Sequence, residues 1–370
     1  MDVEGLRRVK ALIINAGSSS LKVSLFEIDE NLAPAAVWER NEAAVTKLED
    51  IAGEQRNIDV IGHRIVHGGD VYRESVRITP EVRASIARFG ELAPEHNRVE
   101  GAMIDAATRI FGPQAVQVAA FDTAFHATLP PPAFVYPGPY GWLSQGIRRY
   151  GFHGISHQYV SERAAAMVGN QARMITCHLG NGCSLAAIRD GHSVDTTMGF
   201  TPLEGLMMGT RSGSVDPGIL IHLMRDREHT VDDLDRVLNR ESGLKGVSGI
   251  SGDMREVLAA IARGDMRARL AFDIYTHRLA GAIAGLVPSL GGLDALVFTA
   301  GVGENSAAVR EAACGALGFL GVKLDAAKNQ AAAAADVDIA LAESAVRVLV
   351  VHTREQWQIA KECYRVSNPR

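Results

Sequence analysis

The sequence predicts an α/β protein built from two related domains. Its 370 residues are enough for two domains of ordinary size. Residues 11–28 and residues 173–188 each show an apolar strand, a turn of small residues and a second strand. The two turns align weakly, as GSSSL at 17–21 and NGCSL at 181–185. One such unit in each half indicates duplicated domains that face a shared cleft.

The composition is typical of a soluble globular protein. Hydrophobic residues make up 47% of the chain and charged residues 22%, with a formal net charge of -5. This charge gives no support for binding to nucleic acid or to a membrane surface. The first residues, MDVEGLRRVK, lack the apolar core of a signal peptide, and the apolar runs are too short to span a bilayer. Four cysteines without a CxxC pair suit a reducing compartment, so we expect a cytoplasmic protein.

The first small-residue turn is a candidate anion site. A strand ends at Asn15, small residues follow from 16 to 20, and Lys22 lies just beyond. Small residues let backbone N–H groups approach an anion, and Lys22 adds a positive charge. The turn is not a Walker A loop, because GxxxxGK[ST] is absent and a strand follows it. An ordinary hairpin with serine turn chemistry is the alternative.

Two charged residues follow predicted strands in the first half of the chain. A short strand near Val60 delivers Arg64, and a buried strand over 115–121 leads into Asp122. An acid at the C-terminal tip of an apolar strand is a common catalytic position in α/β proteins. Capping of the next turn by Asp122 is the alternative.

Helices are predicted from capping residues and periodicity. Thr79-Pro80-Glu81 is a start signal, and Ser156 is expected to cap a helix that ends near Val168. Asp253 is expected to cap a helix after a Gly/Ser loop that begins at 243. The other predicted helices cover about 97–112, much of 231–286, a segment from near Ser306, and a C-terminal segment from 353–355.

Residues 195–218 fit neither the helical nor the strand period. Glycines, Pro202 and Pro217 interrupt the segment, yet its apolar residues predict that it packs against the protein. Arg211 lies in its middle and offers a planar fork of donors suited to carboxylates and phosphates. We expect the segment to cross the cleft and hold Arg211 over an anionic substrate. A surface loop with a solvated arginine is the alternative.

Two further glycine turns precede predicted helices. His153 lies between Gly151 and Gly154, just before a helix N-terminus, where anions bind readily. A structural histidine is the alternative. Residues 293–305 form a strand and a GxG turn before the helix near Ser306, which is nucleotide-binding geometry. The third glycine of a dinucleotide fingerprint is absent.

Polar residues gather at strand ends and in these turns. Phosphoryl transfer needs positive groups for the phosphoryl oxygens, acids for Mg2+ and turns that cradle phosphates. The residues therefore predict a two-domain phosphotransferase or ATPase without a P-loop, and they leave the acceptor open. The candidates are Asn15, Arg64, Asp122, His153, His178, Asn181, Arg211 and Glu355.

Seven segments together resemble the acetate kinase (acetokinase) family. They are NAGSSSLK at 15–22, GHRIVHGG at 62–69, FDTAFH at 121–126, RYGFHGISH at 149–157, HLGNGCS at 178–184, DTTMGFTPLEGLMMGTRSG at 195–213 and TAGVGENS at 299–306. The family belongs to the acetate and sugar kinase, Hsc70 and actin superfamily. The resemblance therefore implies an α/β fold with two duplicated actin-like (ribonuclease H-like) domains around a nucleotide cleft. The implied domains are 1–127 with 356–370, and 128–355.

The resemblance also implies an activity and its cofactors. ATP would phosphorylate acetate reversibly and in line, giving acetyl phosphate and ADP, with Mg2+ (or Mn2+), in a homodimer. Asn15 and Glu355 would serve the metal, and Asp122 would be the catalytic acid. Arg64 and Arg211 would hold the carboxylate and the phosphoryl group, and His153 with Arg211 would stabilise the transition state.

The same resemblance assigns the remaining binding residues. ATP would be held by Lys22, His178, Leu179, Gly180, Asn181, Gly182, Asp253, Met254, Arg255, Gly301, Val302, Gly303, Glu304 and Asn305. The acyl group would contact Val66, Phe152, Pro202 and Glu95.

The sequence departs from the family pattern in two segments. LAPEHNR places Glu95 where the family has leucine and Arg98 where it has proline, and TREQ at 353–356 retains Glu355 but has Gln356 for an acid. A carboxylate at 95 would disfavour a bare methyl group unless it turns away or pairs with Arg98. Propionate or another short-chain carboxylate is therefore an alternative acceptor, and pyrophosphate an alternative donor. A third hypothesis, from a different functional class, is an ATPase of the same superfamily that acts as a binding module.

Overall fold

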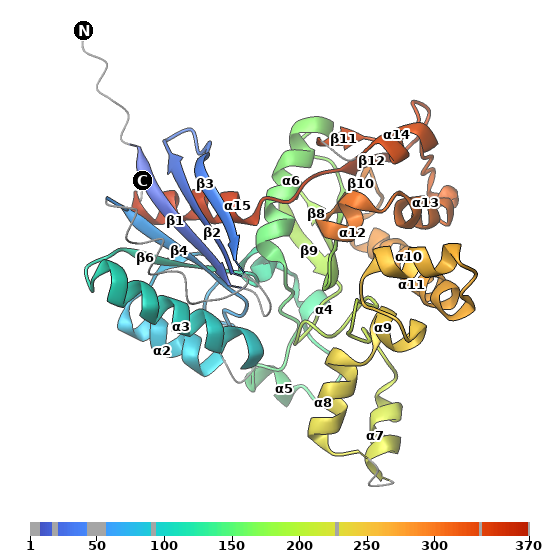
Figure 1. The fold of residues 1–370 in the computed structure, drawn as a ribbon, viewed down its shortest axis with the longest axis horizontal. Coiled ribbons are helices and arrows are strands. Elements are labelled where there is room, and N and C mark those ends of the chain that lie inside the picture. The colour runs from blue at the N-terminus through green and yellow to red at the C-terminus, as the bar shows by residue number, and fades with distance from the viewer. Residues whose placement is uncertain are drawn as a thin grey trace. The chain divides into compact units, whose positions relative to one another are not determined.

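The computed structural model describes residues 8–16, 21–42, 57–89, 94–225, 229–332 and 335–368. The chain divides into two compact units. The first comprises 1–127, 152–159 and 354–370, and the second comprises 128–151 and 160–353. Each unit contains one six-stranded mixed sheet with helices (Figure 1).

The first sheet has the strand order β3-β2-β1-β4-β6-β5. β1 and β4 are parallel, as are β4 and β6, while β2, β3 and β5 pair antiparallel with their neighbours. The strands are β1 (Val9–Ala16), β2 (Leu21–Ile28), β3 (Ala35–Glu42), β4 (Val60–Ile65), β5 (Val76–Arg77) and β6 (Gln117–Phe121). The accompanying helices are α2 (Pro80–Arg88), α3 (Pro94–Phe111), the 3-10 helix η3 (Ala124–Thr128) and α15 (Glu355–Ser367).

The second sheet repeats this topology. Its order is β11-β12-β10-β7-β8-β9, so β7, β8, β9, β10, β11 and β12 correspond to the six strands of the first sheet in chain order. The parallel and antiparallel pairs also correspond. The strands are β7 (Met174–Leu179), β8 (Cys183–Arg189), β9 (His192–Thr196), β10 (Ala295–Thr299), β11 (Val337–Asp338) and β12 (Arg347–Val350). The prediction of two duplicated α/β domains is confirmed.

Helices α4 (Pro131–Phe134) and α5 (Gly141–Ser144) of the second unit precede its first strand, and the other helices that belong wholly to this unit lie in the connections between its strands. These are α7 (Pro217–Arg225), α8 (Val231–Arg240), α9 (Gly243–Ser248), α10 (Met254–Ala262), α11 (Met266–Leu290), α12 (Ala300–Asn305), α13 (Ala307–Gly315), η4 (Gly318–Leu320) and α14 (Ala326–Ala331). The long helix α11 packs along β8 and β9. Helix α6 (Gly154–Val168) begins in the first unit and continues into the second.

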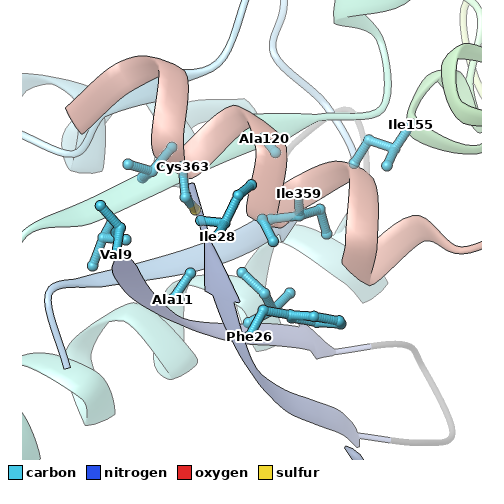
Figure 2. Packing of buried hydrophobic residues seen from close by; sticks show 12 residues of the cluster. Val9, Ala11, Phe26, Ile28, Ala120, Ile155, Ile359 and Cys363 are labelled. Atoms are coloured by element: carbon cyan, nitrogen blue, oxygen red, sulfur yellow. The ribbon is translucent and has the colours of Figure 1, made fainter. Parts of the chain in front are cut away.

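Alternating side chains of β1 build the core of the first unit. Ala11 and Ile13 face α15 and lie in one buried cluster with Ile359. Figure 2 shows Ala11 and Ile359 of this cluster. Leu12 and Ile14 face the other side and pack on Met103 of α3. Both faces of the sheet are therefore covered, as expected for its central parallel strands.

Residues 152–159 belong to the first unit, although the implied boundaries place them in the second domain. Ile155 packs in the cluster beneath α15, and the Gly154 N–H donates to the Asp122 carbonyl at 2.9 Å. The prediction that Ser156 caps this helix is wrong, since Ser156 is a buried residue inside it.

Two glycine-rich segments predicted as loops are helical. Residues 243–248 form α9 because Gly243 and Gly249 take left-handed conformations at its two ends (φ 64° and 73°). The GxG segment forms the short helix α12, in which the Glu304 carboxylate accepts the Ala300 N–H at 2.8 Å. Other predictions are confirmed, including the start of α2 at Thr79, the cap Asp253 of α10 and the start of a helix (α13) near Ser306.

The starts of two helices differ from the prediction. Helix α3 begins at Pro94, three residues before its predicted start, and Pro217 opens α7 rather than interrupting it. No helix within the described residues is long and apolar enough to cross a bilayer.

Substitution of Gly62 tests the packing of α15 on the first sheet, because Gly62 lies against this helix. A Cβ there would lie 2.5 Å from Cys363 Sγ and 2.8 Å from Ile359 Cγ2. We predict that Gly62→Ala lowers the free energy of unfolding by about 1–3 kcal/mol, because the added methyl overpacks the core. Urea denaturation measures the change.

Gly281→Ala in α11 is the matched control, since a Cβ there meets nothing within 4 Å. It should stabilise the protein by about 0.5–1 kcal/mol through helix propensity. An equal effect of both substitutions would contradict the packing described for α15.

Candidate active site

Arg64 and Asp122 form a buried ion pair at the carboxyl ends of two parallel strands of the first sheet. Arg64 is the fifth residue of β4, and Asp122 follows directly after the parallel strand β6. Arg64 Nε donates to Asp122 Oδ1 at 3.2 Å, and Nη2 donates to Oδ2 at 2.5 Å. The Arg64 side chain is 13% exposed and that of Asp122 is 2% exposed. The neighbouring parallel strands therefore hold Arg64 and Asp122 in a bidentate ion pair.

Burial and the neighbouring charges shift the pKa values of both side chains upward. Burial raises the pKa of Asp122 to about 6, although the Arg64 guanidinium opposes the shift. Burial would lower the pKa of Arg64, but the charges of Asp122 and Glu355 together raise it above its ordinary value. Arg64 therefore stays positive beside a carboxyl whose pKa burial holds above its ordinary value.

Asn15 and Glu355 meet next to this pair. Asn15 Nδ2, in β1, donates to Oε2 of Glu355, the first residue of α15, at 3.0 Å. Asn15 is also the register partner of Lys22 on β2, and Lys22 is exposed. The preceding turn, 17–20, lies outside the described residues. The structure thus brings together Asn15, Lys22 and Glu355.

The donor set of Asn15 and Glu355 fits Mg2+. A carboxylate and an amide oxygen are hard ligands, and Mg2+ usually takes one or two carboxylates while it keeps waters and substrate phosphates. Across the described ranges, no group of three or more His, Cys, Asp or Glu side chains is placed to hold a metal ion. The two oxygens of Asn15 and Glu355 would fill only part of the coordination shell of Mg2+, which suits an ion that phosphates and water also bind.

Glu100 is a residue of this site that the sequence did not single out. It lies on α3, is 1% exposed, and both carboxyl oxygens accept the Val66 N–H, at 3.2 and 3.1 Å. Burial raises its pKa to about 8, against the attraction of Arg64. The helical period of the sequence could have indicated that Glu100 is buried, because it lies three and four residues before the buried Met103 and Ile104.

The predicted acyl-pocket and transition-state residues divide between the units. Val66 and Phe152 are buried in the first unit, where the Phe152 ring meets His67 edge-on at 5.5 Å. His153 has a left-handed backbone (φ 56°), and the following Gly154 is bonded to the Asp122 carbonyl. Pro202 belongs to the second unit, and the side chain of Glu95 lies outside the described part of the structure.

Arg211 is held by its own loop in the second unit. Its Nη1 donates to the Pro202 carbonyl at 3.2 Å, and its carbonyl accepts the Met208 N–H at 3.1 Å. Leu206, Met207 and Met208 are buried. The prediction that this long segment packs against the protein is confirmed.

A cavity of about 880 Å³ gathers many of the predicted nucleotide residues. It lies in the second unit, beside the turn that joins β7 and β8 and beside α12. Its lining includes Gly180, Asn181, Asp253, Met254, Arg255, Gly301, Val302 and Asn305, and also Gly252, Leu258, Ser306, Ala307, Ala308 and Gln330. The volume is within the range of small-molecule and cofactor sites.

Five other predicted nucleotide residues of the second unit lie outside this lining, and they are His178, Leu179, Gly182, Gly303 and Glu304, whereas Lys22 belongs to the first unit. His178 and Leu179 are buried at the end of β7, and the Gly180 N–H donates to the Gly182 carbonyl at 3.0 Å. Glu304 accepts the Ala300 N–H at 2.8 Å and the Thr353 N–H at 2.9 Å, and Gly303 is buried. These contacts fix the turn and α12 against the sheet.

Arg310 is a second residue that the sequence did not single out. It is almost completely buried and donates to the carbonyls of Gly303 at 2.8 Å and Glu304 at 2.7 Å. It also donates to Asn329 Oδ1 at 2.7 Å. Arg310 therefore ties α12 to α14, and both helices line the cavity.

Comparisons with known proteins agree with this architecture. The duplicated sheet topology is that of the actin-like superfamily. The structure superposes on the acetate kinase of Porphyromonas gingivalis with a TM-score of 0.85 and 37% identity, over 97% of this chain and 100% of that one. It superposes on a propionate kinase from Francisella tularensis subsp. tularensis SCHU S4 with a TM-score of 0.87 and 37% identity, over the same shares.

The sequence comparisons are more specific. Residues 38–361 match the profile of the Acetokinase family. The chain is 54% identical to the acetate kinase of Gloeobacter violaceus over 402 aligned positions, covering 96% of this chain and 99% of that protein. It is 53% identical to the acetate kinase of Nostoc punctiforme, covering 97% and 99%. The chain belongs to the acetokinase family.

The buried Glu100 predicts a pH dependence of stability. Its pKa rises from 4.5 to about 8 on folding, so the folded protein keeps a proton that the unfolded chain releases within this window. Rising pH should therefore lower the free energy of unfolding, by at most about 1.4 kcal/mol per pH unit from this group. Glu100→Gln keeps an acceptor for Val66 and removes this contribution.

Urea denaturation of both proteins between about pH 5 and pH 8 measures the effect. The variant should gain stability relative to the unsubstituted protein as pH rises. Glu343→Gln, at an exposed position, is the matched control. Parallel stability curves for Glu100→Gln and the unsubstituted protein would show that Glu100 is not buried as a neutral acid.

Proposed function

We propose that the protein is an acetate kinase that transfers the γ-phosphoryl group of ATP directly to acetate, giving acetyl phosphate and ADP. The observation that carries the proposal is the buried Arg64–Asp122 pair at the carboxyl edge of the first sheet. Membership of the acetokinase family and the similarity to named acetate kinases support the choice of acceptor.

The residues of the first unit suit an anionic acceptor. Acetate is already ionised at neutral pH, so its attacking oxygen needs no general base. Arg64 offsets the repulsion between the carboxylate and the γ-phosphate, and Asp122 orients the guanidinium. The apolar, buried Val66 and Phe152 of this unit suit the methyl group.

The second unit suits the nucleotide. The cavity beside α12 holds the adenosine, and the turn around Asn181 offers backbone N–H groups to the phosphates. In this proposal Arg211 of the second unit and His153 of the first unit each stabilise the negative charge on the transferring phosphoryl group. In-line transfer requires positioning and charge stabilisation more than covalent chemistry by the protein.

Mg2+ (or Mn2+) is the proposed cofactor. Asn15 and Glu355 would hold it, directly or through water, because their oxygens fit its preferences. When bound, the ion supplies charge neutralisation at the phosphates. Lys22, beside Asn15 in the sheet, adds a positive charge to the same edge.

Propionate is the second candidate acceptor. The structure matches a propionate kinase as closely as it matches an acetate kinase, at 37% identity in both cases. The two acids differ by one methylene, and a hydrophobic pocket discriminates such a difference by only about 1–3 kcal/mol.

We also propose that the protein works in the cytoplasm as a homodimer, on small molecules rather than on nucleic acid or membranes. Its four cysteines are free and buried, which suits a reducing compartment. Helix α7 supports the dimer, because Ile219, Ile221 and Met224 expose about half of their surface (50%, 51% and 46%).

A hydroxylamine-trapped acyl phosphate assay tests the proposed function. MgATP is offered with acetate, propionate or butyrate, and pyrophosphate replaces ATP in a control. Acetate or propionate should give a hydroxamate with ATP, and pyrophosphate should give none. Arg211→Ala should reduce the signal by at least about 100-fold, and the exposed Arg189→Ala should leave it unchanged. Absence of hydroxamate from every acid, in a protein that binds ATP, would contradict the proposal.

A further inference from the structure

The loop that carries Arg211 has no regular structure of its own. It connects β9, which ends at Thr196, with α7, which begins at Pro217. A catalytic arginine needs a fixed position, because a shift of about 1 Å can cost about 100-fold in rate. Contacts outside the loop must therefore set its conformation.

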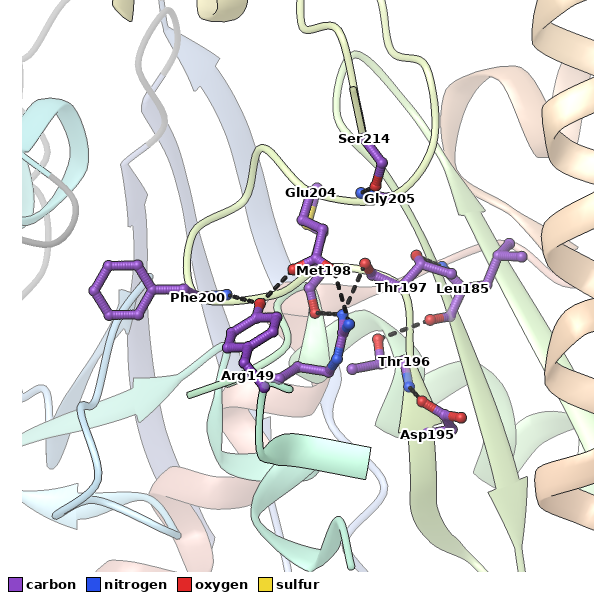
Figure 3. Close-up of polar contacts among 11 residues, drawn as sticks. Arg149, Leu185, Asp195, Thr196, Thr197, Met198, Phe200, Glu204, Gly205 and Ser214 are labelled. Carbon is purple, nitrogen blue, oxygen red and sulfur yellow. Dashed lines mark hydrogen bonds and ion pairs between the residues drawn. The ribbon is translucent and has the colours of Figure 1, made fainter. Parts of the chain in front are cut away.

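Three side chains of the second unit fasten the first part of this loop, and we call Tyr136, Arg149 and Glu204 the clasp. Arg149 Nη2 donates to Glu204 Oε1 at 2.8 Å (Figure 3). Arg149 Nη1 donates to the carbonyls of Thr197 and Met198, each at 3.0 Å. The guanidinium of Arg149 thus binds both the beginning of the loop, at Thr197, and the Glu204 carboxylate seven residues later.

Tyr136 completes the clasp. Its hydroxyl donates to Glu204 Oε2 and accepts the Phe200 N–H at 2.9 Å. Burial, together with the neighbouring Glu204, raises the pKa of Tyr136 well above its usual value, so the hydroxyl keeps the proton that it donates. Both oxygens of Glu204 are therefore engaged.

Gly199 shows how tightly the clasp closes. A Cβ at this position would lie 1.7 Å from Glu204 Oε2 and 2.1 Å from the Tyr136 hydroxyl oxygen. The Gly199 carbonyl accepts the Tyr150 N–H at 3.0 Å, which adds a backbone bond beside the side-chain contacts. Only glycine leaves room for the carboxylate at the centre of the clasp.

The clasp connects to Arg211 through a short path. Glu204 lies two residues after Pro202, whose carbonyl accepts Arg211 Nη1 at 3.2 Å. Gly205 and Ser214 then close the loop, since the Gly205 N–H donates to Ser214 Oγ and the Ser214 N–H donates to the Gly205 carbonyl, both at 2.9 Å. The contacts of Glu204 thus fix the position of Pro202, and the Pro202 carbonyl in turn binds the Arg211 guanidinium.

We propose that Glu204 is a positioning residue for the phosphoryl transfer, which acts through Pro202 to place the Arg211 guanidinium. The inference rests on the proposed function. The proposal gives residues 202–205 (PLEG) the role of positioning Arg211. Neither the composition of the loop nor its glycines indicate this role. Glu204 touches no substrate in this role and works only by holding the loop.

Steady-state kinetics of Glu204→Gln test the inference. The neutral amide keeps the shape but loses the charge-assisted bond with Arg149 and the second acceptor. We expect kcat to fall about 10–100-fold, with the KM for ATP within about twofold, because the nucleotide cavity lies on other segments of the unit. Tyr136→Phe removes a single hydroxyl and should lower kcat in the same direction but less.

Asp294→Asn is the matched control. It breaks another short ion pair of the second unit, in which Arg173 Nη2 donates to Asp294 Oδ1 at 2.6 Å, and should leave kcat unchanged. A kcat for folded Glu204→Gln and Tyr136→Phe equal to that of the unsubstituted protein would overturn the inference. So would equal losses in Asp294→Asn. If the unsubstituted protein makes no acyl phosphate, the proposed function itself fails, and the two failures are thereby distinguished.

Discussion

The first unit depends on one interaction, the ion pair of Arg64 with Asp122. Two buried charges lose their hydration, and only good geometry with further hydrogen bonds compensates this cost. Neighbouring parallel strands supply the geometry, because β4 and β6 bring both residues to the same edge of the sheet. Helix α15 covers the sheet and delivers Glu355, while α3 delivers Glu100. The fold thus gathers three carboxyl groups around a single guanidinium.

The duplicated topology gives the two units different tasks at equivalent places. In the first sheet, the carboxyl ends of β1, β4 and β6 carry Asn15, Arg64 and Asp122. In the second sheet, the equivalent ends of β7 and β10 carry the Asn181 turn and α12, which line the cavity. Ligands of open α/β sheets bind beyond the carboxyl ends of the strands. Under the proposed function, substitution at these ends, rather than a new fold, lets one architecture serve both an acyl group and a nucleotide.

The sequence predicted what depends on local signals. Strands, caps such as Thr79 and Asp253, and polar residues at strand ends follow from neighbouring residues. Helices α9 and α12 were not predicted, because their glycines favour a loop locally and distant contacts fold them. The bond between Arg149 and Glu204 was not predicted either, since 55 residues separate them. Neither Glu100 nor Arg310 forms part of a local motif, and their roles emerge only from packing.

A double-mutant cycle on the central ion pair measures the main claim most directly. The kcat/KM for acetate is determined for Arg64→Ala, Asp122→Asn and the double variant. If Asp122 acts by orienting Arg64, its loss should matter little once Arg64 is gone. We predict that the double variant falls within about threefold of the less active single variant. Losses that multiply, as for two independent sites, would contradict a pair that works as one unit.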